Sequence, residues 1–211
     1  MQIKRFEFNP IAENTYVVYD QTKEAVVIDC GVYTNREKEL FNRFIQENGL
    51  TIKHSLFTHL HFDHIFGLAF IYDTFGLSPE YNKKEEIIPT LAQQAGFFGM
   101  NVEDRVIPAG KYLQEGDSVL FGDSEFKTIE VPGHSPGSIC FYSAAHACLF
   151  SGDVVFRGSI GRTDLWAGDY DQLITGIKDK ILILPEETAV YPGHGLVTTV
   201  RYEKNSNPFL Q

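Results

Sequence analysis

The chain has 211 residues, of which 43% are hydrophobic and 13% aromatic, a composition that can fill a packed core and excludes a disordered or fibrous protein. Its 28 acidic and 18 basic residues give a formal net charge of -10, the wrong sign for general binding to nucleic acid or to an anionic membrane. The three cysteines show no CxxC spacing, and no apolar run is long enough for a membrane span or a secretory signal. We therefore expect one cytoplasmic domain over residues 1–211.

The first half of the chain predicts four strands and three helices. Runs rich in β-branched and aromatic residues predict strands at residues 3–8, 15–19, 25–29 and 52–58. Apolar residues at helical spacing predict a helix over residues 35–48, with Asn35 as its N-cap and Gly49 as its stop. Two further helices are expected at residues 65–75, where the apolar composition predicts burial, and at residues 84–95.

The second half returns to strands before it ends in helices. Strands are expected at residues 118–121, 125–131, 138–142, 147–150 and 188–191, with helices at residues 170–184 and near 198–204. Because strand blocks and helices alternate twice, the sequence favours an α/β sandwich of two sheets covered by helices over a single doubly wound sheet.

The densest polar cluster follows the strand expected at residues 52–58 and spells T-H-L-H-F-D-H over residues 58–64. Imidazoles and carboxylates are the ligands that zinc and related ions prefer, whereas crowded histidines gain nothing from one another. In extended backbone His59, His61 and Asp63 share one side and His64 turns away, so that two neighbouring ions are the natural solution. The alternative is a solvated loop in which Asp63 only caps the next helix.

Three more strand ends lead into turns that carry one possible ligand each: His134 in V-P-G-H-S-P-G, Asp153 in L-F-S-G-D, and His194 in V-Y-P-G-H-G. Taken singly, an aspartate or histidine in a turn usually shapes the turn or is exposed. Together with the first cluster they supply five histidines and two aspartates, the set expected for two ions bridged by one carboxylate.

In this order, the four motifs resemble the metallo-β-lactamase superfamily, and most closely its glyoxalase II (hydroxyacylglutathione hydrolase) branch. E-N-T-Y at residues 13–16, I-D-C-G at 28–31 and N-P-F-L at 207–210 are similar to that branch as well. The resemblance implies a four-layer αββα sandwich, with two mixed sheets flanked by helices. It also implies a short form, because the branch carries a C-terminal helical domain that supplies much of its grip on glutathione, and few residues follow His194.

The same resemblance assigns a role to each ligand. It implies a first ion held by His59, His61 and His134, a second held by Asp63, His64 and His194, and Asp153 as the bridge between them. Asp29 resembles the carboxylate that orients a ligand histidine in the family, although a strand-end turn beside Gly31 is the alternative. His54 and His146 match no motif and are expected at the surface.

The chemistry implied by the resemblance is metal-dependent hydrolysis. Two divalent ions, zinc in the first place with iron or manganese as alternatives, would hold a water as hydroxide, and Asp63 would orient it. That metal-bound hydroxide would attack a thioester carbonyl such as that of S-lactoylglutathione, whose thiolate leaves with little help from an acid. We therefore expect a small-molecule partner, with a glutathione thioester as the candidate, and neither nucleic acid nor membrane; the oligomeric state stays open.

Other activities of the superfamily fit the same residues to different degrees. A persulfide dioxygenase uses one Fe(II) held by two histidines and a carboxylate, here His59, His134 and Asp153, and lactonases share all seven ligands. Antibiotic hydrolysis is disfavoured because true β-lactamases are exported and lack the aspartate at position 153. A non-catalytic binding module is disfavoured because seven clustered polar groups destabilise a fold when they are unpaired.

The loop after Asp153 is expected to form the rim of the site. Arg157 or Arg162 could bind a substrate carboxylate through two hydrogen bonds. An ion pair that stiffens the loop, such as Arg162 with Asp164, is equally open. The apolar stretch F-F-G-M at residues 97–100 is interpreted as core or subunit contact rather than as a lid.

Overall fold

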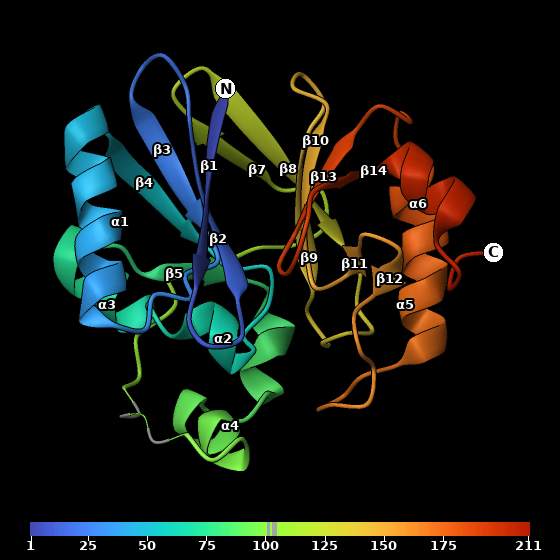
Figure 1. The fold of residues 1–211 in the computed structure, drawn as a ribbon, viewed down its shortest axis with the longest axis horizontal. Coiled ribbons are helices and arrows are strands. Elements are labelled where there is room, and N and C mark those ends of the chain that lie inside the picture. The colour runs from blue at the N-terminus through green and yellow to red at the C-terminus, as the bar shows by residue number, and fades with distance from the viewer. Residues whose placement is uncertain (101, 103–104) are drawn as a thin grey trace.

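A computed structural model gives the fold and describes residues 1–100, 102 and 105–211. Two six-stranded sheets face each other in the middle of the molecule, and helices cover their outer sides (Figure 1). This architecture confirms the predicted sandwich of two mixed sheets flanked by helices. Within the described ranges, no helix is both long and apolar enough to cross a membrane. The three cysteines are free and buried.

The first sheet is built from the N-terminal half of the chain. Its strands, in spatial order, are β1 (Gln2–Phe8), β2 (Glu13–Tyr19), β3 (Glu24–Ile28), β4 (Thr51–Leu56), β5 (Pro79–Tyr81) and β6 (Lys111–Tyr112). The first three strands are antiparallel, and β3 to β6 run parallel to one another. The carboxyl ends of these parallel strands therefore meet at one edge, where polar residues of the following loops can gather.

The second sheet is built from the C-terminal half. Its spatial order is β14 (Thr198–Thr199), β13 (Ala189–Pro192), β10 (Cys148–Gly152), β9 (Ile139–Ser143), β8 (Ser124–Glu130) and β7 (Ser118–Phe121). Only the central pair β10 and β13 is parallel, so these two strands end side by side. A small hairpin of β11 (Val155–Phe156) and β12 (Ser159–Ile160) follows β10 directly.

Helices form the outer layers and one end of the sandwich (Figure 1). On the side of the first sheet lie α1 (Asn35–Asn48) and α3 (Leu68–Phe75), and on the side of the second lie α5 (Tyr170–Gly176), the π-helix η2 (Ile177–Ile181) and α6 (Val200–Ser206). The short α2 (Phe62–Ile65), the 3-10 helix η1 (Lys83–Ile87) and α4 (Leu91–Phe97) complete the set. Figure 1 shows α2 and α4 at the lower end of the molecule.

The core follows from the alternation of side chains along the strands. Val17 and Val27 point to one side of the first sheet and pack with Phe41 of α1, whereas Val18 and Val26 point to the other. There they meet aromatic residues of the second sheet such as Phe126, Phe141 and Phe150. The two sheets are thus joined by a dry apolar layer that fixes the loops at their ends.

Three helix predictions need correction. Helix α1 spans the predicted residues, but its N-cap is Thr34, whose hydroxyl accepts a hydrogen bond from the Glu37 N–H while Glu37 bonds back to the Thr34 N–H. Within the stretch predicted as a buried helix at residues 65–75, α3 begins only at Leu68 and buries only Ile71. The helix predicted at 84–95 is split into η1 and α4, because Pro89 removes a backbone donor and forces the preceding residue into extended backbone.

Candidate metal centre

Four loops at one end of the sandwich bring the predicted ligands together. The loop after β4 and helix α2 carry His59, His61, Asp63 and His64, while the turns after β8, β10 and β13 carry His134, Asp153 and His194. Five of the seven are buried, namely His59, His61, Asp63, His64 and His134, whereas Asp153 and His194 are partly exposed. The strand ends thus hold seven polar side chains between the sheets.

One group consists of His59, His61 and His134, which offer one ligand atom each within 4.8 Å of one another. The Nε2 atoms of His59 and His134 lie 3.2 Å apart. Burial and the neighbouring imidazoles lower the pKa of His59 well below its usual value, and they lower that of His61 to about 3. The rings are therefore neutral at neutral pH, the state in which an imidazole nitrogen can bind a metal.

A second group consists of Asp63, His64 and His194, again with ligand atoms within 4.8 Å. Asp63 Oδ2 lies 3.0 Å from His194 Nε2 and 3.6 Å from His64 Nε2. Burial opposes protonation of His64, but the carboxylates around it outweigh burial and raise its pKa. The pocket therefore attracts positive charge.

Asp153 lies between the two groups. Its Oδ1 is 3.4 Å from His64 Nε2, and its Oδ2 is 3.7 Å from both His134 Nε2 and His194 Nε2. Burial alone would raise the pKa of Asp153, yet the histidines around it lower the pKa below its usual value, so the carboxylate is ionised at neutral pH. One carboxylate thus faces a histidine of each group.

Asp29 stands behind the cluster and accepts three hydrogen bonds. Its Oδ1 accepts from the Thr58 N–H at 2.8 Å, and its Oδ2 accepts from the Thr58 hydroxyl at 2.8 Å and from His64 Nδ1 at 2.9 Å. Because the Thr58 hydroxyl donates to Asp29, it accepts from His59 Nδ1 at 3.0 Å. Asp29 therefore orients one histidine of each group and turns both Nε2 atoms toward the centre.

The donor set fits metal ions. Three buried atoms of the centre make no hydrogen bond: His61 Nε2, and the pair His64 Nε2 and Asp153 Oδ1, which lie 3.4 Å from each other. A buried polar atom without a partner destabilises a fold by about 1–3 kcal/mol, so three in one place call for a ligand. Imidazoles and ionised carboxylates that converge in two groups suit two divalent cations of the zinc, iron or manganese type.

A cavity of about 180 Å³ opens above the ligands. Its walls, apart from five of the ligands, are formed by Ile11, Phe62, Phe98, Arg162, Leu165 and Trp166. The side chain of Arg162 forms an ion pair with Asp164, which was one of the two roles that the sequence left open. The backbone carbonyl of Arg162 accepts a hydrogen bond from His134 Nδ1 at 2.8 Å. Arg157 is absent from this wall; its guanidinium lies 5.0 Å from the Tyr202 ring centroid, and both residues line a different hollow.

Phe97 and Phe98 are not core residues, so that of the two predicted roles, core or subunit contact, the first is wrong and the second stays a prediction. They are 73% and 42% exposed, and Phe98 lines the cavity. Of the two histidines outside the motifs, His146 is exposed as predicted. His54 is half-buried instead, and it joins Glu80 at 2.6 Å and the Leu120 carbonyl of the second sheet at 3.1 Å.

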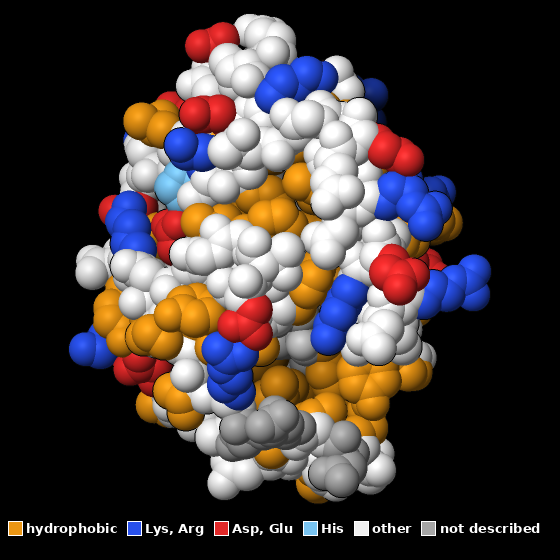
Figure 2. Space-filling view, turned by 90° about the vertical axis from the view of Figure 1, so that its left-hand side faces the viewer, with side chains coloured by type: hydrophobic (Ala, Val, Ile, Leu, Met, Phe, Trp, Pro, Cys, Tyr) orange, Lys and Arg blue, Asp and Glu red, His pale blue; other side chains and the backbone are white. Residues whose placement is uncertain are grey.

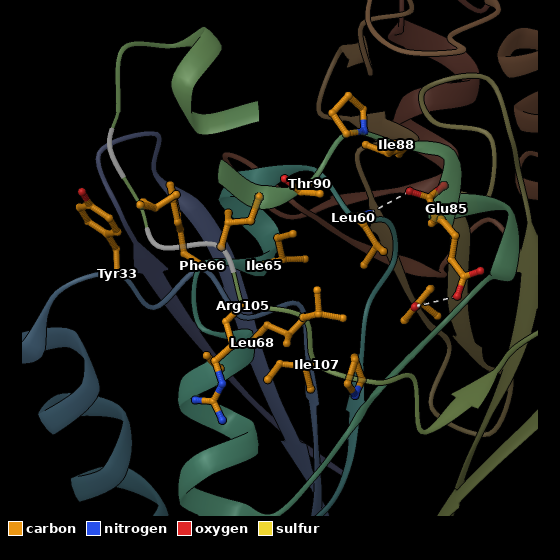
Figure 3. A pocket seen from close by; sticks show the side chains of 18 of the residues that line it. Tyr33, Leu60, Ile65, Phe66, Leu68, Glu85, Ile88, Thr90, Arg105 and Ile107 are labelled. Atoms are coloured by element: carbon orange, nitrogen blue, oxygen red, sulfur yellow. Dashed lines mark hydrogen bonds between the residues drawn. The ribbon is translucent and has the colours of Figure 1, made fainter. Parts of the chain in front are cut away.

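Two residues outside the ligand set hold the ligand loops, and sequence reasoning missed the first of them. Glu85 Oε2 accepts from the Leu60 N–H at 2.9 Å (Figure 3), and its Oε1 accepts from the Ser135 hydroxyl at 2.8 Å and the Gly137 N–H at 2.5 Å. Glu85 thereby ties the loop of His59 and His61 to that of His134. Nothing in the K-K-E-E run distinguishes Glu85 from its exposed neighbour.

Asn14 plays the corresponding part for His194. Its buried side-chain amide donates to the carbonyls of Pro192 at 2.9 Å and Gly195 at 3.0 Å, which flank His194. The Tyr16 hydroxyl donates to the Pro192 carbonyl as well, at 2.7 Å. The E-N-T-Y motif therefore links the first sheet to the last ligand loop.

A second and larger hollow, of about 520 Å³, lies on the other side of Leu60 (Figure 3). Its lining is mostly apolar, with Ile65, Phe66, Leu68 and Ile107 among its residues, and contains none of the seven ligands. Figure 2 looks at the left-hand side of Figure 1 and shows apolar side chains interspersed with charged ones of both signs. Leu60, from the loop of His59 and His61, and Glu85, which braces that loop, both line this hollow.

Comparison with known proteins identifies the family, because the model of the metallo-beta-lactamase superfamily matches residues 9–194. The chain belongs to this superfamily. Hydroxyacylglutathione hydrolase GloC of Haemophilus influenzae is 35% identical over 212 residues, which cover 100% of this chain and 98% of GloC. This similarity confirms the resemblance to the hydroxyacylglutathione hydrolase branch.

Solved structures of the superfamily superpose over nearly the whole chain. The BLEG-1 B3 metallo-beta-lactamase is 36% identical with a TM-score of 0.87, and the match covers 100% of both chains. TTHA1623 in a di-iron-bound form is 36% identical with a TM-score of 0.86, covering 98% of this chain and 100% of that one.

Proposed function

We propose that the protein is a metal-dependent thioester hydrolase with two metal ions in its centre. The observation that carries the proposal is the geometry of the centre, in which two groups of three ligands flank Asp153 and leave unpaired nitrogen and oxygen atoms facing inward. Two relatives agree with this reading, since one is named a hydroxyacylglutathione hydrolase and another has been solved with two irons.

In this proposal His59, His61 and His134 hold the first ion, Asp63, His64 and His194 hold the second, and Asp153 bridges them. Zinc is the first candidate for both, with iron and manganese as alternatives. When bound, such ions lower the pKa of a water toward neutrality and polarise a carbonyl oxygen. Asp63 lines the cavity and can orient the attacking water and take up its proton, and Asp29 holds two of the histidines in the ligating tautomer.

The cavity wall favours a thioester over an amide. Apart from the predicted ligands, no described residue that lines the cavity has an acidic group that could protonate a departing amine. A thiolate leaves without such protonation because its conjugate acid has a pKa of about 8.5. The substrate proposed here is therefore a small thioester of the S-lactoylglutathione type.

The test combines metal analysis with turnover. The full chain, loaded with zinc, iron or manganese, is expected to bind two ions per chain and to hydrolyse S-lactoylglutathione, measured as release of free thiol. Asp153→Ala should lose both properties, since the variant removes the group shared by the two ions. One iron per chain, together with oxygen consumption on glutathione persulfide and no thiol release from the thioester, would instead establish the dioxygenase alternative.

A further inference from the structure

The rim of the metal cavity is a continuous row of aromatic rings from three separate parts of the chain. Phe62 of α2 stacks on Phe98 with ring centroids 4.8 Å apart, and Phe98 contacts Phe97 at 5.2 Å. Phe97 then meets the edge of Trp166 at 6.1 Å, and Trp166 lies 6.0 Å from the ring of the ligand His61. The row therefore leads from the protein surface to the metal centre.

Two of these rings, Phe97 and Phe98, are exposed where a globular protein usually buries them. Phe97 and Phe98 keep most or much of their surface in contact with water, and Ile11 on the same rim is 39% exposed. Contiguous exposed apolar surface beside a polar cavity marks a place where a ligand is bound. The rim therefore offers apolar contact to whatever enters the cavity.

The same wall offers little to a charged ligand. Among the residues that the structure describes, Arg162 is the one cationic side chain of the cavity, and its Nε and Nη2 atoms donate to the two oxygens of Asp164 at 2.7 and 2.8 Å. Glutathione carries two carboxylates at neutral pH, and the chain itself has a net charge of -10. The side chains of the wall therefore give glutathione no strong electrostatic contact, so that cationic attraction in the cavity comes from the proposed metal ions.

The size of the cavity decides which part of a thioester it can take. Its volume of about 180 Å³ is below the roughly 300 Å³ at which pockets for drug-sized ligands begin. An acyl group of up to the size of a phenyl-bearing hydroxyacid fits such a space, whereas a tripeptide or nucleotide thiol does not. The thiol carrier must therefore lie outside the cavity.

We propose that the enzyme selects its substrate by the acyl group, with a preference for thioesters of apolar or aromatic acyl groups, and that it is nearly indifferent to the thiol carrier. The inference rests on the proposed thioester hydrolysis and specifies its substrate class. In the reaction, water forms the new C–O bond, the C–S bond breaks, and the products are the carboxylate, the thiol and one proton. Phe98 and Trp166 are the residues that determine specificity.

The test uses a two-by-two set of substrates with the metal-loaded full chain. Lactoyl and mandeloyl groups are each attached to glutathione and to the uncharged N-acetylcysteamine, and kcat/KM is measured for all four. The mandeloyl esters should be hydrolysed more efficiently than the lactoyl esters on both carriers by about 2- to 10-fold, the effect of one aromatic contact. The two carriers should differ by less than about threefold, within the effect of a solvent-exposed charge.

Variants of the rim connect this preference to its residues. Trp166→Ala and, independently, Phe98→Ala should lower kcat/KM for the mandeloyl esters more than for the lactoyl esters, so that the mandeloyl preference is lost. Phe209→Ala is the matched control, because Phe209 is an equally exposed phenylalanine, at 44%, in the C-terminal tail. Its acyl preference should equal that of the wild type.

Two results overturn the inference while leaving thioester hydrolysis intact: a preference of about tenfold or more for glutathione with either acyl group, or rim variants that keep the mandeloyl preference. Absence of hydrolysis with all four esters in protein that holds its metals would overturn the proposed function itself. The two failures are thus distinguishable in one experiment.

Discussion

Replacing Glu85 by glutamine should loosen the two loops that carry the first ligand group without touching any ligand. The Glu85 carboxylate is buried and receives the backbone N–H groups of Leu60 and Gly137, one at each oxygen. Glutamine keeps the shape but replaces one oxygen by an NH₂ group, which cannot accept a hydrogen bond. In Glu85→Gln one of the two backbone donors therefore loses its acceptor.

The magnitude follows from the number of donors left without a partner. A buried donor without an acceptor destabilises the fold by about 1–3 kcal/mol, so Glu85→Gln should lower the unfolding free energy by that amount and Glu85→Ala by about 2–6 kcal/mol. The Ser135 hydroxyl adds little, because it keeps its bond to the Ser138 hydroxyl at 2.7 Å. Burial raises the pKa of Glu85, because a buried carboxylate loses its hydration, and this cost offsets part of the stabilisation that its charge provides. The loss of unfolding free energy in Glu85→Gln should therefore lie near the lower end of the range, about 1 kcal/mol.

Urea unfolding of the metal-free protein, followed by circular dichroism, measures this difference, and titration with zinc measures the affinity of the first ion. Glu86→Gln is the matched control, since Glu86 is the next residue of the same 3-10 helix, is exposed, and bonds only tyrosine hydroxyls. The control should stay within about 0.5 kcal/mol of wild type. Equal unfolding midpoints for the two variants, with equal zinc affinity, would refute the role of Glu85.

Three further predictions concern the second ligand group and the sheets. Asp29→Asn should weaken metal binding at His64 by about 10- to 100-fold in a zinc titration, because the group that orients the ring is altered. Gly193→Ala should lower the metal content in metal analysis, since its methyl carbon would lie 2.2 Å from Asp153 Oδ1 and 2.6 Å from His64 Cε1. The hydrogen bond to Glu80 raises the pKa of His54. The stabilisation that protonated His54 gives the fold is therefore fully present below the unfolded-state pKa of about 6.5, and it is lost as the pH rises through the higher folded-state pKa.

Each of these changes has a control in the chain. Asp20→Asn alters another buried turn carboxylate and should leave zinc affinity unchanged. Gly195→Ala strains the same loop at a φ of +76° but meets no atom within 4 Å, so it should keep both ions. For the pH dependence, the difference in stability between wild type and His54→Gln should shrink from about pH 6 to pH 9, and an unchanging difference contradicts the reasoning; the exposed His146→Gln should show no such trend.

Local sequence predicted most of what local physics controls. Val26 and its neighbours form a buried strand because β-branched residues pack well in a sheet covered on both faces, and Gly49 ends α1 because only a glycine adopts its left-handed φ of +62° without strain. The N-cap was assigned to Asn35 instead of Thr34, because both residue types cap helices well and they are neighbours. The break at Pro89 competed with a longer apolar period that predicted a continuous helix.

The sequence by itself determined the fold class and the choice of possible ligands, because metal binding requires histidines and aspartates at strand ends in close spacing and few other functions do. Tertiary structure alone decided what surrounds them. Glu85 and Glu86 are identical neighbours, yet only the packing of η1 against two distant loops makes one of them a buried brace. Likewise the row of rings from Phe62 to Trp166 exists only because α4 and the loop before α5, far apart along the chain, meet over the metal cavity.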